Sequence, residues 1–262
     1  AYEIPLRLVG SEMGIRDSPQ PIGRITYQEL RELSYMGASV LHEEAVFPVM
    51  EAGIPIAIKN TNRPQDPGTI ISDRDDYVSG EPIITGVTGK RNFVAVHVLK
   101  DHLTNEIGYY RRVLSVFERY RVSVEHIPSG IDSFAVVVRG EDVKDSLWSI
   151  VSDIKREVEP DKIKVVDDLA LVSTVGRNMV GRPGVSGSLF AALGQEGVSI
   201  RMMSQGSDEI NIIVGVRDSD FERAIRAIYR AFSDGDHLLE LSDLKRAEEE
   251  ARIETAGLAS RE

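Results

Sequence analysis

The sequence contains no cysteine, which excludes disulfide bonds, thiolate metal sites and a cysteine nucleophile. It has no apolar run of the roughly 18 residues that suggest a membrane-spanning helix, and its N-terminus has no charged region followed by an apolar core. Long runs of lysine and arginine are missing too, and a formal net charge of -11 repels phosphate backbones. These absences predict a cytoplasmic protein that binds neither nucleic acid nor membranes.

What is present is the composition of an ordinary globular protein. Hydrophobic residues make up 42% and charged residues 28% of the 262 residues, with no sign of a disordered or fibrous chain. At roughly 150 residues per domain, a chain of this length predicts about two domains.

The N-terminal part of the chain predicts two helices and a strand. Residues 1–20 have neither periodicity nor a helix cap, and we leave them unassigned as a possible truncation junction. Thr26 and Glu29 have the spacing of a capping box, which starts a helix. The expected apolar face of this helix consists of Leu30, Leu33, Tyr35 and Met36. A second short helix is expected near Leu41–Ala52, and alternating isoleucines predict a strand over Ile54–Ile58.

The most informative feature is an internal repeat. Residues 108–138 align without a gap on residues 184–214. The identical residues of the first copy are Gly108, Val122, Ser123, Gly130, Asp132 and Val138. Farther along, both copies contain an apolar stripe with i, i+4, i+7, i+11 spacing, which is one helix face present twice. Its members are Val143, Leu147, Ile150 and Ile154 in the first copy and Phe221, Ile225, Ile228 and Phe232 in the second.

Each copy predicts the order strand, helix, strand, strand, helix. In the first copy we expect strands at Phe93–Leu99, Val122–Ile127 and Phe134–Val138, with a helical stripe from Val113 to Tyr120. This order lets two helices cover one face of an antiparallel sheet, as in the ferredoxin-like βαββαβ plan, and leaves the other face free. Two copies could therefore pair within one chain or between chains.

The run Gly86–Lys90 has the residue types of a phosphate-binding loop but not their spacing. Ile84 stands where that motif needs glycine, and Arg91 stands where it needs serine or threonine. We interpret the run as a turn between short strands. The five histidines have no spacing that forms a metal site either, so no metal is expected.

Three stretches of the sequence carry a resemblance to a known family. Ile25–His42, Ile54–Pro64 and Pro67–Ile71 are similar to the C-terminal part of the catalytic domain of aspartokinases. The repeated units resemble the paired ACT domains, small amino-acid-sensing folds, that follow the catalytic domain in that family. The resemblance extends from Pro21 to Ser233. Ser123–Asp132 is similar to the lysine-responsive branch found in Gram-positive bacteria, some members of which also need threonine.

The resemblance implies an α+β fold, in which tandem ferredoxin-like ACT domains follow a part of an α/β amino-acid-kinase domain. The expected division is a kinase-like segment at 21–72, a connector at 73–82, a first unit at 83–165, a second unit at 166–235 and an acidic tail at 236–262. Strand 83–88 could complete the second unit.

One departure from the family concerns catalysis. Aspartokinases open with a Lys-Phe-Gly-Gly segment that grips phosphate, followed by most of an amino-acid-kinase fold, and neither occurs in this sequence. Many relatives also carry lysine where Ser39 stands. Phosphoryl transfer depends on positioned cations around the γ-phosphate, so we expect the fragment to be inactive alone and to hold no cofactor. For the complete enzyme the resemblance implies ATP and Mg²⁺.

A candidate amino-acid site lies at the start of a helix in the first unit. The loop Leu103–Tyr109 precedes this helix, where free backbone N–H groups and the helix dipole favour a carboxylate. Oxygens for ammonium groups stand at Glu125, Ser129 and Asp132. Spacing alone also fits a simpler interpretation, in which Gly108 tightens a turn and the polar residues are solvated. The resemblance implies an effector pocket formed by Leu103, Thr104, Asn105, Ile107, Gly108, Tyr109, Ser123, Val124, Glu125, Ser129, Gly130, Ile131 and Asp132.

The second unit has an equivalent loop at Asn178–Gly184, with proline and glycine as helix-start signals. This loop could bind a second effector. We favour a structural role for it, because its partner positions Arg201 and Gln205 do not reproduce the acidic Glu125.

Three functions of different classes remain open. The first is the regulatory portion of an aspartate kinase, which binds lysine, with threonine as a further candidate, and forms a homodimer through its ACT-like units. Such a portion would serve feedback inhibition of the first step of aspartate-family amino-acid biosynthesis. The second is a working kinase whose core is supplied by another chain, and the third is a structural dimerisation module without a ligand of its own.

Overall fold

The computed structural model describes residues 7–10, 22–36, 41, 43–62, 64–73 and 81–233. Ser39, most of the predicted connector and the predicted acidic tail lie outside these ranges. Within them, helices pack on a largely antiparallel sheet, and the N-terminal part carries a small sheet of its own. The predicted α+β class is therefore confirmed.

The kinase-like segment contains the two predicted helices and the small sheet. Its elements are β2 (Arg24–Ile25), α1 (Tyr27–Tyr35), α2 (Glu43–Glu51), β3 (Ile56–Ile58) and β4 (Thr69–Ile71). Strand β4 lies between β2, which is parallel to it, and β3, which is antiparallel. The predicted capping box is confirmed, because the Thr26 N–H donates to the Glu29 carboxylate at 2.8 Å and the Glu29 N–H donates to the Thr26 hydroxyl at 3.1 Å.

The two units follow in one continuous run of elements. The first contains β5 (Gly86–Leu99), the 3₁₀ turn η1 (Leu103–Asn105), α3 (Tyr109–Arg119), β6 (Ser133–Arg139), α4 (Gly140–Val143), α5 (Leu147–Val158) and β7 (Lys162–Val175). The second adds η2 (Arg177–Met179), α6 (Val185–Gln195), β8 (Met202–Gln205), β9 (Asn211–Val216), η3 (Asp218–Asp220) and α7 (Phe221–Ser233). In the segment that we left unassigned, β1 (Arg7–Gly10) pairs in parallel with the start of β5.

Strands β5 and β7 join the two units. They pair antiparallel from Gly86 opposite Val175 to Leu99 opposite Lys162, with register shifts near the middle. Strand β6 extends the sheet beside the second half of β5, whereas β9 and then β8 extend it beside the second half of β7. The first half of β5 therefore completes the sheet of the second unit, and the first half of β7 completes that of the first unit. The repeat is fused into a single sheet.

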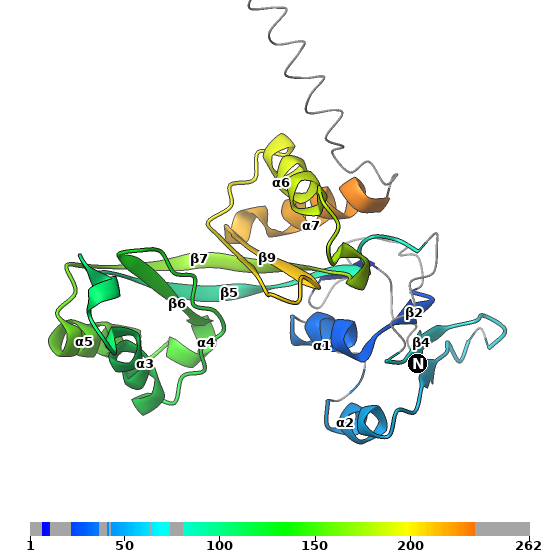
Figure 1. The fold of residues 1–262 in the computed structure, drawn as a ribbon, viewed down its shortest axis with the longest axis horizontal. Coiled ribbons are helices and arrows are strands. Elements are labelled where there is room, and N and C mark those ends of the chain that lie inside the picture. The colour runs from blue at the N-terminus through cyan, green and yellow to red at the C-terminus, as the bar shows by residue number, and fades with distance from the viewer. Residues whose placement is uncertain are drawn as a thin grey trace, which may run out of the picture.

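The helices of the two units lie on opposite sides of the β5–β7 pair. Figure 1 shows α3 and α5 on one side and α6 and α7 on the other. In β5, Val94, Val96 and Val98 enter the core of the first unit, whereas Val87 enters the core of the second. Because successive side chains of a strand point to opposite faces, even and odd positions serve different cores.

Helix α1 covers the face of the second unit that its own helices leave open. Leu33 packs so closely on β5 that a Cβ on Gly86 would lie 3.1 Å from it. The Thr88 hydroxyl donates to the Met36 carbonyl at 3.1 Å, and the Met36 side chain is buried in a cluster that includes Leu171. The prediction of a free sheet face is therefore wrong for the second unit, because a helix of the same chain fills it.

The segment Val122–Ile127 does not form the predicted strand. It runs beside β6 and makes one isolated bridge, at His126 opposite Val137. The N–H groups of Glu125 and His126 both donate to the Val137 carbonyl, at 2.8 and 3.4 Å, which is the two-against-one pattern of a bulge. Pro128 then has no N–H to continue the ladder.

The repeated apolar stripe is buried in both units, but it forms one helix only in the second. In α7 the stripe is continuous from Phe221 to Phe232. In the first unit Lys144–Ser146 separates α4 from α5, although Val143 and Ile150 both remain in the core.

The run Gly86–Lys90 is strand, and our interpretation of it as a turn is wrong. It forms the first half of β5, where a Cβ on Gly89 would lie 2.5 Å from the Leu171 carbonyl oxygen and 2.6 Å from the Phe221 ring. Glycine here lets Phe221 of α7 pack directly on the strand backbone.

Replacing Gly89 tests this packing. We expect Gly89→Ala to lower the free energy of unfolding by about 1–3 kcal/mol, because the new methyl group overlaps a backbone oxygen that cannot move freely. The measurement is urea unfolding followed by circular dichroism. Gly194→Ala in α6 is the matched control, since no atom lies within 4 Å of its Cβ position, and it should stabilise the protein by up to about 1 kcal/mol. Equal effects of the two substitutions would contradict the packing argument.

Candidate functional site

The predicted loop of the first unit ends at the start of α3. Gly108 is the N-cap of this helix with φ of 77°, a left-handed conformation that suits glycine. Leu103 and Tyr109 anchor the loop in the core, whereas Ile107 is 94% exposed. The Tyr109 N–H donates to the Glu106 carbonyl at 3.2 Å. The N–H groups that follow in the first turn of α3 could donate hydrogen bonds to a carboxylate.

The turn Ser129–Asp132 lies at the same end of the first unit. Its backbone is fixed to the end of β5, shortly before the loop, because the Lys100 N–H donates to the Asp132 carbonyl at 2.9 Å. Just after the turn, the Phe134 ring meets the Tyr109 ring edge to face, with centroids 6.3 Å apart. The Asp132 side chain is exposed. The structure therefore brings together two parts of the predicted site, the helix-start loop and the turn that contains Asp132.

Glu125 lies apart from these two segments. Its backbone pairs with Val137, toward the end of β6 that is remote from the turn. Its carboxylate accepts a hydrogen bond from Arg139 Nε at 2.8 Å and another from the Tyr35 hydroxyl of α1. The Glu125 side chain is only 3% exposed. Glu125 thus connects the first unit to the kinase-like segment.

Tyr35 was not among the predicted site residues. Its spacing predicts a place on the apolar face of the first helix, and a tyrosine at helical spacing gives no signal of a distant carboxylate partner. Burial, together with the hydrogen bond to Glu125 and its negative charge, raises the pKa of Tyr35 to about 12, although Arg139 opposes the rise. The hydroxyl therefore stays protonated and remains a hydrogen-bond donor at neutral pH.

At its N-terminal end, α1 is held to the second unit by a buried carboxylate. Glu29 is fully buried and accepts hydrogen bonds from the Thr85 hydroxyl and from the Arg177 backbone, the latter at 2.8 Å. The Arg177 guanidinium donates to Glu29 at 2.9 Å and also pairs with Glu81. The residue that caps α1 thus also fixes α1 to the start of the second unit.

Glu29 and Arg177 keep each other charged despite their burial. Burial alone would raise the pKa of Glu29, but hydrogen bonds from Thr85, Thr26 and Arg177 and the charge of Arg177 outweigh burial and lower it. Burial lowers the pKa of Arg177, but the charges and hydrogen bonds of Glu29 and Glu81 offset this and raise it. Glu29 and Arg177 therefore form a buried ion pair.

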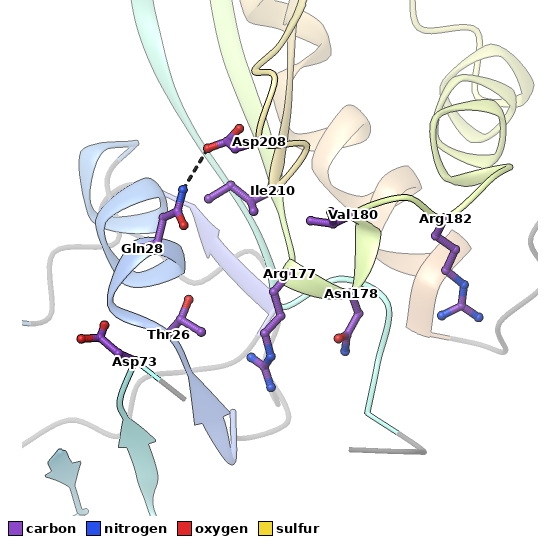
Figure 2. A pocket seen from close by; sticks show the side chains of 9 residues that line it. All are labelled: Thr26, Gln28, Asp73, Arg177, Asn178, Val180, Arg182, Asp208 and Ile210. Atoms are coloured by element: carbon purple, nitrogen blue, oxygen red, sulfur yellow. Dashed lines mark hydrogen bonds between the residues drawn. The ribbon is translucent and has the colours of Figure 1, made fainter. Parts of the chain in front are cut away.

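A cavity of about 680 Å³ borders this ion pair (Figure 2). Its walls come from the start of α1, the end of β4, the helix-start loop of the second unit and the turn before β9. The lining residues are Thr26, Gln28, Asp73, Arg177, Asn178, Val180, Arg182, Asp208 and Ile210. Gln28 Nε2 donates to the Asp208 carboxylate at 2.9 Å across one edge. The second helix-start loop therefore faces the kinase-like segment, whereas the Arg201 guanidinium donates to the Asp168 carbonyl of β7.

The face of the first unit opposite its helices carries another, smaller cavity of about 260 Å³. Its lining residues are Ala95, His97, Pro128, Ala135, Val137, Lys164, Val166, Leu169, Arg201 and Met202. Burial, and then the nearby charge of Lys164, lower the pKa of His97, so this imidazole is neutral at pH 7. The lining of this cavity is mostly apolar and includes the cations Lys164 and Arg201.

Known proteins share this arrangement of a kinase-like segment and ACT-like units. The amino acid kinase family matches residues 12–60, and the ACT domain matches residues 172–232. Aspartokinase 3 of Bacillus subtilis (strain 168) is 36% identical over 220 residues, which are 84% of this chain and 48% of that protein. Aspartate kinase of Clostridium acetobutylicum, in its crystal structure, is 48% identical with a TM-score of 0.79, covering 84% of this chain and 51% of that one. Aspartokinase III of E. coli, in complex with lysine and aspartate, has a TM-score of 0.68 at 21% identity, covering 87% and 51%, and this likeness concerns the fold alone.

These likenesses define the class of protein: the end of an amino-acid-kinase domain followed by tandem ACT units. The chain belongs to the aspartokinase family. It spans about half the length of the curated and solved relatives that it matches. Within the described residues, no helix is both long and apolar enough to cross a bilayer.

The ion pair of Glu29 and Arg177 should make the free energy of unfolding depend on pH. The folded-state pKa of Glu29 is below its ordinary value of 4.5. Its ionised form therefore stabilises the fold above that pH, and the stabilisation is lost as pH falls through the lowered pKa. We expect Glu29→Gln to lower the free energy of unfolding by about 3 kcal/mol at neutral pH, and the difference from wild type to shrink below pH 4.5.

Urea unfolding between pH 3 and pH 8 measures this difference. Gln28→Ala, on the exposed side of the same helix turn, is the control and should change the free energy of unfolding by less than about 0.5 kcal/mol. A difference between wild type and Glu29→Gln that does not change with pH would contradict the assigned charge.

Proposed function

We propose that this chain is the regulatory part of an aspartate kinase, and that its first unit binds an end-product amino acid, lysine, for feedback inhibition. The observation that carries the proposal is the meeting of the Gly108 helix start with the Asp132 turn at one end of the first unit. A free α-amino acid has a carboxylate for the helix start and an ammonium group for the carboxylate of the turn. The side-chain ammonium of lysine would add a second contact of this kind.

The relatives support an amino acid as the class of effector. E. coli aspartokinase III was crystallised with lysine and aspartate. For this chain, lysine follows from the similarity of Ser123–Asp132 to the lysine-responsive branch, and threonine is the further candidate. The complete enzyme would act in the cytoplasm with ATP and Mg²⁺ on the first step of aspartate-family biosynthesis, and the fragment would be inactive alone.

We assign no effector to the cavity between α1 and the second unit. Arg177, its most buried cation, is already paired with Glu29 and Glu81. Asp208, the repeat equivalent of Asp132, already accepts a hydrogen bond from Gln28. Two of the groups that could bind an amino acid there, Arg177 and Asp208, are therefore engaged by the chain itself, which favours a structural role for the second loop.

A second copy of the chain fits the open face of the first unit. Two exposed isoleucines flank the proposed effector site, with Ile107 94% and Ile131 76% exposed. In addition, Glu125 and Asp132 of one chain lie toward different ends of β6, so an effector that contacts both would draw one of them from a partner. A homodimer would cover the apolar face and complete the site.

The first test of this function compares equivalent positions of the two units. We expect Asp132→Asn to weaken lysine binding about tenfold, because a charge-assisted hydrogen bond to the ammonium is lost. Asp208→Asn, at the matching position of the second unit, should leave the affinity unchanged. Isothermal titration calorimetry measures both. Equal losses at the two positions would reject the assignment, and an absence of binding to the wild-type chain would favour a purely structural module.

The second test concerns the homodimer. We expect light scattering at micromolar concentration to give twice the mass of one chain. His97→Arg should shift the protein toward monomer, because it would place an unpaired cation beside Lys164 and Arg201 in a covered face. Gln195→Arg, on the exposed end of α6, is the control. If the wild-type chain is a monomer in the presence of lysine, the proposed homodimer is wrong. If His97→Arg remains a dimer, the interface does not lie on this face.

A further inference from the structure

The contact between Tyr35 and Glu125 lies between the kinase-like segment and the proposed effector unit. Tyr35 is the last residue of α1, and its hydroxyl donates to one oxygen of the Glu125 carboxylate. The other oxygen accepts from Arg139 Nε at 2.8 Å. Tyr35 itself is 42% exposed, whereas the Glu125 side chain is 3% exposed. Tyr35 therefore covers a carboxylate that would otherwise face solvent or a ligand.

We propose that Tyr35 is a positioning residue of the effector site, whose hydroxyl competes with an ammonium group of the effector for Glu125. This inference rests on the proposed function, in which Glu125 contributes to amino-acid binding. Both oxygens of the carboxylate are occupied and almost no surface of it is exposed, so an incoming ammonium has to displace one of the two donors.

The chemistry of the two donors decides which one leaves. Arg139 is charged and donates from the same unit as Glu125, on the neighbouring strand β6. Tyr35 is neutral, and its phenol remains protonated because its pKa is raised to about 12. Hydrogen bonds between two ions are stronger than those between a neutral group and an ion. An ammonium therefore replaces the Tyr35 hydroxyl, and Arg139 stays.

Displacement of the Tyr35 side chain would directly affect the C-terminal end of α1. The end of the helix is held to β5 by Lys90 Nζ, which donates to the Tyr35 carbonyl, and by the Thr88 hydroxyl, which donates to the Met36 carbonyl. The Lys90 ammonium also lies 5.7 Å from the centroid of the Tyr35 ring. Binding at Glu125 thus acts on the same helix end that rests on the second unit. By linkage, the Tyr35 contact must weaken effector binding as much as the effector weakens the contact.

The test is the affinity of the full chain for L-lysine after loss of the hydroxyl. Competition predicts that Tyr35→Phe binds lysine at least about tenfold more tightly than wild type, since a hydrogen bond to a carboxylate no longer has to be broken. Tyr120→Phe is the matched control, because it also removes a hydroxyl that bonds a carboxylate, that of Asp153 at 3.1 Å, on the far end of α3. Its affinity should equal that of wild type. Titration calorimetry gives both values.

A second readout separates competition from a change in packing. Hydrogen exchange of the amides in the last turn of α1, which ends at Tyr35, should speed up when lysine is added to wild type, and should respond much less in Tyr35→Phe. Unchanged or weaker lysine binding by Tyr35→Phe would overturn the inference while the proposed function stands. If the wild-type chain and both variants fail to bind lysine, the inference about Tyr35 and the proposed function are both wrong.

Discussion

Two antiparallel strands, β5 and β7, carry both units, and each is 14 residues long. Since they are paired from end to end, neither unit can shift against the other without breaking this ladder. Alternating side chains of the same strands serve cores on opposite faces, with Val87 on one side and Val94 on the other. A slip of one residue would therefore remove apolar side chains from both cores at once. The register of a single strand pair thus fixes the relative position of the two units.

The same constraint gives two similar units different surroundings. Because their helices lie on opposite sides, their open sheet faces also point in opposite directions. The face of the second unit is occupied by α1, whose Leu33 and Met36 pack onto β5 and β7. The face of the first unit keeps a cavity bordered by His97 and Lys164. The division of roles that we propose for the units follows from where the chain places one helix, more than from differences within the repeat.

Local signals in the sequence predicted local structure well. The capping box of Thr26 and Glu29 and the apolar stripe of the second unit depend on residues within a few turns, so spacing alone was sufficient there. The prediction of a turn at Gly89 was wrong, because glycine is needed there for the packing of Phe221, which comes from the far end of the chain. The partner of Glu125 could not be predicted either, since Tyr35 reaches it only after α1 has docked. The family resemblance predicts the candidate site, whereas only the structure shows that Glu125 of this site is hydrogen-bonded to α1.

The two ends of α1 differ in how firmly they are held, and magnitudes decide what an effector could move. At the N-terminal end, removing one partner of the buried pair of Glu29 and Arg177 costs roughly 3–5 kcal/mol. At the C-terminal end, the hydroxyl of Tyr35 contributes a hydrogen bond to a carboxylate, worth about 1.5–3 kcal/mol net. Allosteric coupling is typically about 1–3 kcal/mol, enough to break the second contact but not the first. An effector in the first unit would therefore release only the end of α1 at Tyr35, and the helix would stay attached to the second unit through Glu29.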